Sequence, residues 1–258
     1  MSLLALVYQL VPDSPILVAA NREESLDRSC PNPTIQSGKP RILASFDPKT
    51  KGTYLGVNQR GMMAAAIPRK KFGSAIGTKS RSLLCREMLK CPTARAAVDM
   101  AVAQLHTDQY DGVNLVVADA DSGWVIHSST QTEVVELNPG LNIIGNYNLD
   151  DPRDGRVGLA RRMLTLQTLD SPVKFLALAS KVFARGMTEP GRPSMVLRES
   201  GYGTVSSTLI ALGKKPRDAI YQYAGGAPDV VRYEDFSPFL RDILSRGLRE
   251  NRIRATNT

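Results

Sequence analysis

The residue with the clearest chemical potential is Ser2, which directly follows the initiator Met1. A serine hydroxyl is a poor nucleophile unless a base takes its proton. Removal of Met1 would leave Ser2 with a free α-amine, whose pKa of about 7.7–8.0 suits that task. Ser2 therefore has two interpretations: a nucleophile that carries its own base, or an ordinary serine near the start of a chain.

A dense polar segment, residues 21–28, lies shortly after Ser2 in the sequence. It follows two apolar runs, residues 3–11 and 16–20, which a proline-containing turn separates. Such runs predict a β-hairpin, which would return the polar segment to the neighbourhood of Ser2. A secretory signal peptide is not indicated, because no basic region precedes the first run and Asp13 and two prolines interrupt the apolar part.

The rest of the chain shows strand-like and helix-like patterns in turn. Further strands are predicted over residues 53–57, 62–67, 113–118, 124–128, 133–137, 141–145, 204–212 and 219–223. Helices are predicted over residues 79–90, 93–105, 156–169, 172–185 and 238–252. Because the strands come as hairpins and not as βαβ units, mainly antiparallel sheets are expected. This order predicts an α+β fold in which helices cover two stacked sheets.

The composition is that of an ordinary globular protein. With 258 residues, 42% hydrophobic and 22% charged, we expect one domain over residues 1–258. No apolar stretch approaches the ~20 residues that cross a bilayer. The three cysteines lack metal-ligand spacing, which favours free thiols and predicts a cytoplasmic location. With only His106 and His127 available, neither a Ser-His-Asp triad nor a histidine-rich metal site is expected, and no cofactor is predicted.

The net charge of +8 has two interpretations, a solvated basic face or the attraction of an anionic ligand. No nucleic-acid recognition motif and no stripe of basic and aromatic residues accompanies it, so a nucleic-acid partner is not expected. The predicted partner is a small acyl or anionic ligand. The sequence does not indicate an oligomeric state.

Two segments carry a family resemblance. Residues 19–24, Ala-Ala-Asn-Arg-Glu-Glu, and residues 52–61, Gly-Thr-Tyr-Leu-Gly-Val-Asn-Gln-Arg-Gly, resemble the NRDE family. Further likeness appears in order at residues 111–115, 144–150 and 202–208. The family is similar to the N-terminal nucleophile hydrolases, which implies an αββα sandwich. Its layout resembles the choloylglycine and penicillin V amidases, which cleave amides with the first residue of the mature chain.

The resemblance implies a catalytic set. Ser2 would be the nucleophile and its amine the base, while Asn21 and Glu24 would hold the amine and orient the substrate. Asn146 would donate a hydrogen bond to the oxyanion. Each of these residues has a structural alternative. Asn21 could cap a turn and Glu24 could pair with Arg28, while Asn146 could be an ordinary loop residue.

Two arginines, Arg22 and Arg156, are expected to bind substrate on the same resemblance. For Arg22 the alternative is an ion pair with Glu23 or Asp27, because neighbouring residues on a strand point to opposite faces.

The sequence departs from the family pattern in two places. Ser2 stands where the family has cysteine, a better nucleophile, and Glu23 replaces an aspartate. The leading hypothesis is an amide or acyl hydrolase. The alternative is a non-catalytic binding or trafficking protein for haem or an acyl-CoA-like ligand, which retention of Met1 would favour.

Overall fold

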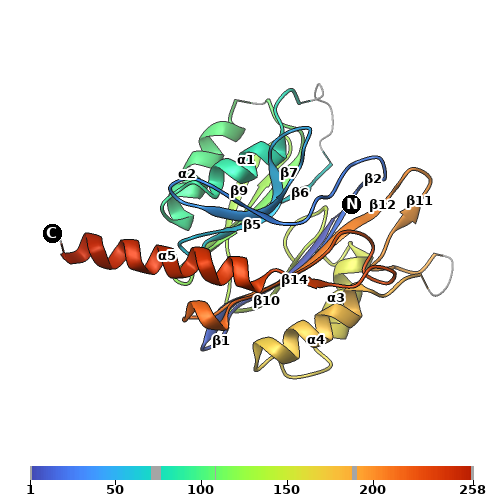
Figure 1. Cartoon of the computed structure of the whole chain (residues 1–258). Coiled ribbons are helices and arrows are strands. Elements are labelled where there is room, and N and C mark those ends of the chain that lie inside the picture. Colours follow the sequence, from blue (N-terminus) through green and yellow to red (C-terminus); the bar gives the residue numbers. More distant parts are fainter. Residues whose placement is uncertain (1, 71–76, 108, 188–190, 257–258) are drawn as a thin grey trace.

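The computed structural model describes residues 2–70, 77–107, 109–187 and 191–256, and within them two sheets are stacked face to face (Figure 1). All pairs between the strands of these sheets are antiparallel. One pair of helices covers the outer face of each sheet. The predicted αββα sandwich is therefore confirmed.

The first sheet contains the N-terminal hairpin and the polar segment, residues 21–28, up to Ser25. Its strand order is β10-β1-β2-β12-β13-β14, with β11 added to β12. The bounds are β1 Leu3–Val11, β2 Ser14–Ser25, β10 Gly140–Ile144, β11 Arg198–Glu199, β12 Tyr202–Leu212, β13 Ile220–Ala224 and β14 Glu234–Asp235. The predicted hairpin of β1 and β2 is present, and it pairs Leu3 with Asn21.

The second sheet follows chain order from β3 to β9. Its strands are β3 Thr34–Gln36, β4 Ile42–Phe46, β5 Thr53–Asn58, β6 Met63–Pro68, β7 Val113–Ala118, β8 Gly123–Ser128 and β9 Thr132–Glu136. The turn between β5 and β6 needs Gly61, whose φ of +81° lies in the left-handed region that glycine adopts without a steric penalty.

Alternation along the strands creates separate cores. On β1 and β2, Leu4 and Val18 face the second sheet, while Leu3 and Ala19 face the helices α3 Gly155–Leu164 and α4 Pro172–Phe183. The helices α1 Arg81–Met88 and α2 Ala94–Leu105 cover the second sheet. Even-numbered residues of β1 and β2 thus point between the sheets, and odd-numbered residues point to the helices.

The last helix, α5 Ser237–Thr256, packs against β4, β5 and β13 and leads away from the sandwich to the C-terminus (Figure 1). None of the described helices is both long and apolar enough to cross a bilayer.

Several boundaries differ from the sequence prediction. Strand β2 runs to Ser25 instead of ending at residue 20, because β12 pairs with it over this whole length. The polar cluster therefore lies within the strand and does not follow it. The short strands β3 and β4 were not predicted, and α3 ends at Leu164 instead of residue 169.

Candidate functional site

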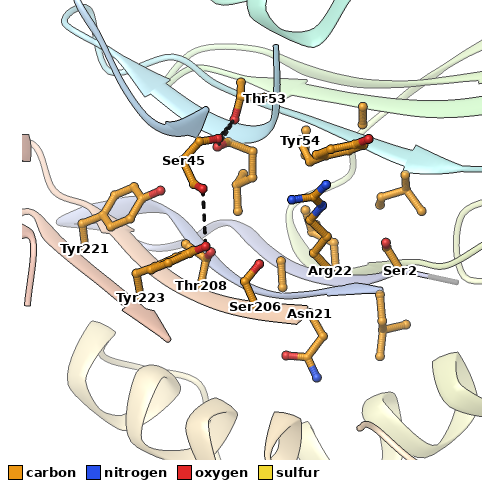
Figure 2. Close-up of a pocket in the computed structure, with 17 residues that line it drawn as sticks. Ser2, Asn21, Arg22, Ser45, Thr53, Tyr54, Ser206, Thr208, Tyr221 and Tyr223 are labelled. Atoms are coloured by element: carbon orange, nitrogen blue, oxygen red, sulfur yellow. Dashed lines mark hydrogen bonds between the residues drawn. The ribbon is translucent and has the colours of Figure 1, made fainter. Parts of the chain in front are cut away.

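A cavity lies between the two sheets, beside the start of β1. Ser2 lines it at one end, together with Arg22 of β2 and Tyr54 of β5 (Figure 2). The strands β12 and β13 supply the wall at the other end. The cavity thus joins the chain's first described residue to segments distant in sequence.

Ser2 is 8% exposed, and its Oγ accepts a hydrogen bond of 3.3 Å from the backbone N–H of Glu23. The alternation along β1 places its side chain on the face between the sheets. Met1 lies outside the described residues, so its retention or removal is not part of this geometry. The hydroxyl is held at the cavity wall by the backbone of the neighbouring strand.

Arg22 extends into the cavity close to Ser2 (Figure 2). Its guanidinium carbon lies 3.9 Å from the ring centroid of Tyr54, a cation–π contact. Its Nη1 donates to the sulfur of Cys30 at 3.1 Å. Buried Nε and Nη2 atoms of Arg22 have no hydrogen-bond partner in the described part of the chain. The arginine therefore presents unused donors and a positive charge at the site.

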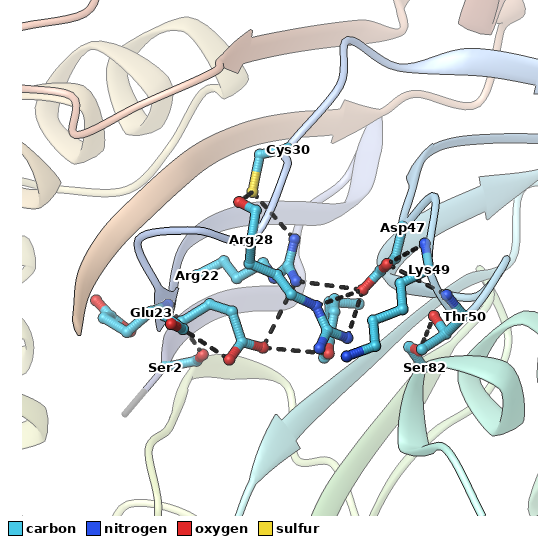
Figure 3. A network of polar contacts seen from close by, with 12 residues as sticks. Ser2, Arg22, Glu23, Arg28, Cys30, Asp47, Lys49, Thr50 and Ser82 are labelled. Atoms are coloured by element: carbon cyan, nitrogen blue, oxygen red, sulfur yellow. Dashed lines mark hydrogen bonds and ion pairs between the residues drawn. The ribbon is translucent and has the colours of Figure 1, made fainter. Parts of the chain in front are cut away.

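Asp47 anchors the arginines at this end of the cavity (Figure 3). Its Oδ2 lies 2.7 Å from Nη2 of Arg28 and 3.7 Å from Nη2 of Arg22. Burial raises the pKa of Asp47, but hydrogen bonds from Arg28 and from the N–H groups of Lys49 and Thr50 outweigh it and hold the pKa below its usual value. Asp47 therefore stays anionic.

Glu24 also lies on the cavity face, near Arg22. Its Oε2 accepts a hydrogen bond of 3.3 Å from the Tyr54 hydroxyl and lies 3.6 Å from Nη2 of Arg22. Among the described contacts, the ion pair of Arg28 is with Asp47 and not with Glu24. The structure thus brings Ser2, Arg22 and Glu24 to one face of the sheet.

Asn21 is among the residues that line the cavity, but its side chain points to the opposite face of the sheet. Its Nδ2 donates to the carbonyl oxygens of Phe183 at 2.9 Å and Met195 at 3.0 Å, which ties β2 to the end of α4. The expected contact with the amine of Ser2 is not formed by this amide. The reason is the odd–even alternation of a strand that continues through the cluster.

Glu23 and Arg156 form a buried ion pair on this helical face. Nη2 of Arg156 lies 2.8 Å from Oε1 of Glu23, which also accepts from Thr204 Oγ1 at 3.2 Å. Glu23 is 2% exposed, and burial raises its pKa to about 7 although Arg156 opposes the shift. The partner of Glu23 is Arg156 and not Arg22, and Arg156 does not line the cavity.

Glu23 is the residue near the site that the sequence reasoning did not select. Its backbone holds the Ser2 hydroxyl, and its side chain fixes Arg156. The signal that could have found it was the strand alternation, which requires a β2 that continues past residue 20.

Asn146 follows the end of β10, the strand that pairs with β1. Its Nδ2 donates to the carbonyl of Pro68, at the end of β6 in the other sheet. The carbonyls on either side of Asn146 both accept from Nδ2 of Asn114, at 2.8 Å and 2.7 Å. This loop is therefore tied to the second sheet, and Asn146 is not among the cavity-lining residues.

The sequence comparison identifies one matching family. The sequence model of the family described as Transport and Golgi organisation 2 matches residues 1–221. No curated protein matches the chain.

Solved structures similar to this chain share its two-sheet architecture. The N-acylethanolamine-hydrolyzing acid amidase orthologue of Caenorhabditis elegans has a TM-score of 0.52 at 15% identity, covering 81% of this chain and 92% of its own. Penicillin V acylase from Agrobacterium tumefaciens has a TM-score of 0.52 at 12% identity, covering 92% and 86%. At these identities the likeness shows the fold, which is that of the N-terminal nucleophile hydrolases.

Proposed function

Because this chain belongs to the Transport and Golgi organisation 2 family and has the fold of N-terminal nucleophile hydrolases, we propose that it hydrolyses an amide or related acyl bond with Ser2 as nucleophile. The observation that carries this proposal is the position of Ser2 at the cavity wall, beside a half-buried Arg22 whose Nε and Nη2 are unused hydrogen-bond donors. A nucleophile and a cation at one end of a cavity suit the attack on an acyl group.

The reaction requires removal of Met1, which frees the amine of Ser2. The amine takes the hydroxyl proton as Oγ bonds to the acyl carbon, and that proton passes to the leaving amine as the C–N bond breaks. Water then attacks the acyl–serine ester, releases the acid and restores the hydroxyl. The hydrogen bond from the Glu23 N–H orients Oγ for the first step.

Arg22 supplies positive charge where negative charge develops or where the substrate carries an anionic group. Glu24 and Tyr54 position Arg22 by an ion pair and a ring contact. For Asn146 we propose a contribution to the oxyanion through the amide N–H that does not bind Pro68. Asn21 acts as a positioning residue for β2.

The test combines mass spectrometry of the purified protein with turnover of a panel of acyl amides. We expect a chain without Met1 and turnover that Ser2→Ala abolishes, while Ser2→Cys retains it because a thiol is a better nucleophile. Thr130→Ala, which removes a hydroxyl from an exposed residue in the turn after β8, is the control with unchanged turnover. Met1 retained in active protein, or equal turnover by Ser2→Ala, would reject the mechanism.

A second candidate is binding without turnover. The family cysteine is replaced by Ser2, and one N–H of Asn146 is already used by Pro68; both favour a retained cavity with reduced chemistry. No histidine, cysteine or methionine is among the described residues that line the cavity, but three tyrosines are, so both haem and an acyl-CoA-like thioester are candidate ligands. Saturable binding of either ligand without product formation, weakened by Arg22→Ala, is the expected result for this candidate.

A further inference from the structure

Two residues with hydroxyl groups line the end of the cavity opposite Ser2. Tyr221 is 1% exposed and Thr208 is 6% exposed, and both line the cavity. Neither side-chain hydroxyl forms a hydrogen bond with the described residues, and Figure 2 shows the Tyr221 hydroxyl directed into the cavity. A hydroxyl directed into a cavity normally binds water or a ligand group there.

Neighbouring hydroxyls at the same end are already used within the wall. The Tyr223 hydroxyl donates to the carbonyl of Cys30 at 3.3 Å or to Ser45 at 3.4 Å. Ser45 donates to the carbonyl of Pro31 at 2.6 Å. Among the described residues at this end, the hydroxyls of Tyr221 and Thr208 thus remain available to a ligand; Ser206 also lines the cavity but pairs with Arg22, nearer the other end.

The cavity also has an uncharged, apolar part of its lining. Leu4, Ala20, Leu55, Ala65 and Ile67 supply its side chains. These residues suit the methylene groups of an acyl chain better than any polar segment.

Register gives the separation of the two ends. Arg22 pairs with Ser206, and Tyr221 pairs with Ile210, four residues further along β12. At about 3.3 Å per residue this is about 13 Å along the strand. Arg22 is the one charged residue among the described residues that line the cavity, so the inner end has no cation to accept a carboxylate.

We propose that the inner end of the cavity is a subsite for a neutral hydrogen-bonding group, a hydroxyl or an amide, at the far end of an acyl ligand, held by Tyr221 and Thr208. This inference rests on the proposed function in placing the reactive acyl carbon beside Ser2. Burial raises the pKa of Tyr221, so its phenol remains a neutral donor. A carboxylate at this position would lose its hydration without gaining a charged partner and is excluded.

The experiment measures binding to the full-length Ser2→Ala protein, so that no turnover is needed. The probes are three acyl amides of equal chain length, ending in a methyl, a hydroxyl or a carboxylate, and the readout is calorimetric Kd. We expect the hydroxyl-ended amide to bind about tenfold more tightly than the methyl-ended one, with the carboxylate weakest. Adding Tyr221→Phe, or Thr208→Val, should bring the hydroxyl-to-methyl ratio close to one.

The matched control is Tyr8→Phe in the same background. Tyr8 is a buried tyrosine of β1 that does not line the cavity, and its hydroxyl accepts from Gln9 at 3.0 Å. It should leave the ratio unchanged. Equal binding of the hydroxyl and methyl probes, no binding of any probe at millimolar concentration, or a preference that survives both substitutions would overturn the subsite.

The two proposals fail in different ways. A hydroxyl preference in binding, without turnover by the wild type, retains the subsite and rejects the hydrolase. Turnover by the wild type with no preference for a distal hydroxyl retains the hydrolase and rejects the subsite.

Discussion

The two faces of β2 hold similar residue types in different surroundings. Toward the helices, Glu23 lies 2.8 Å from Arg156 in a pair whose side chains are 0% and 10% exposed. Toward the cavity, Glu24 lies 3.6 Å from Arg22, with side chains 25% and 13% exposed. The pair on the helical face is buried and has a short N–O distance, whereas the pair on the cavity face is partly exposed and has a longer one. A single strand thus carries a structural ion pair on one face and the proposed site on the other.

The energetic expectation differs accordingly. Removing one partner from a buried ion pair leaves a charge without compensation and typically costs about 3–5 kcal/mol, whereas a partly solvated pair contributes about 0–1 kcal/mol. Folding should therefore depend on the helical face, and ligand binding on the cavity face.

The largest expected effect is on the buried pair. Arg156→Met should lower the free energy of unfolding by about 1–3 kcal/mol, because Glu23 and the carbonyl of Met195 lose a buried donor; the cost stays below that of a fixed charge, since Glu23 can take up a proton at pH 7. Arg22→Met is the matched variant on the other face and should cost about 1 kcal/mol or less, since Asp47 keeps Arg28. Urea unfolding at pH 7 measures both. Equal losses would show that the two faces are not distinct.

The next effect concerns pH. The pKa of Glu23 rises from 4.5 to about 7 on folding, so between these values the unfolded chain binds fewer protons at this position than the folded chain. Stability supplied by protonated Glu23 is therefore complete below pH of about 4.5 and is lost as the pH rises to about 7. Urea unfolding at pH 5 and pH 7.5 should show this loss in wild type and a smaller one in Glu23→Gln.

The contribution of His127 to stability changes with pH in the opposite direction, so it must be separated from the contribution of Glu23. Burial and then the charge of Arg69 lower its pKa to about 4, so its contribution grows as the pH rises from about 4 to 6.5. The informative quantity is thus the difference between wild type and Glu23→Gln at each pH. If that difference does not change with pH, Glu23 does not titrate in this range.

The smallest expected effect on stability is that of Glu24→Gln. A quarter of this side chain is exposed, and the amide can still accept from the Tyr54 hydroxyl, so we expect a loss below about 0.5 kcal/mol. Binding of an acyl amide should weaken more than stability does, because Arg22 loses one of its anionic partners. Unfolding and calorimetric titration of the same preparation check this; a stability loss of several kcal/mol would place Glu24 with the scaffold.

The sequence was informative where local patterns decide structure. The hairpin of β1 and β2, the antiparallel sheets and the two helical layers follow from apolar periodicity and turns, and all are present. The end of β2 could not be read in this way, because residues 21–25 are polar or charged and are held as a strand by β12, which lies about 180 residues later.

Only part of the candidate site could be predicted from the sequence, because distant partners decide where the other side chains lie. Ser2 was selected by its type and position, and Arg22 and Glu24 by the family resemblance; all three lie on one face. The placements of Asn21, Arg156 and Asn146 depend on partners such as Met195, Glu23 and Pro68, which no local pattern connects to them. Tyr221 and Thr208 appeared as ordinary strand residues until the cavity between the sheets was known.

The central position of β1 also has a consequence for when the N-terminus can be processed. Residues 3 and 4 are 1% exposed, and β1 lies between β2 and β10, which is formed from residues more than 130 positions later. A peptidase that trims the end of the chain must grip an extended segment. Under the proposed function, trimming of Met1 would compete with incorporation of β1 into the sheet and would belong to the interval before β10 has been synthesised and docked. Maturation would then be timed by translation and folding, and not by the finished protein.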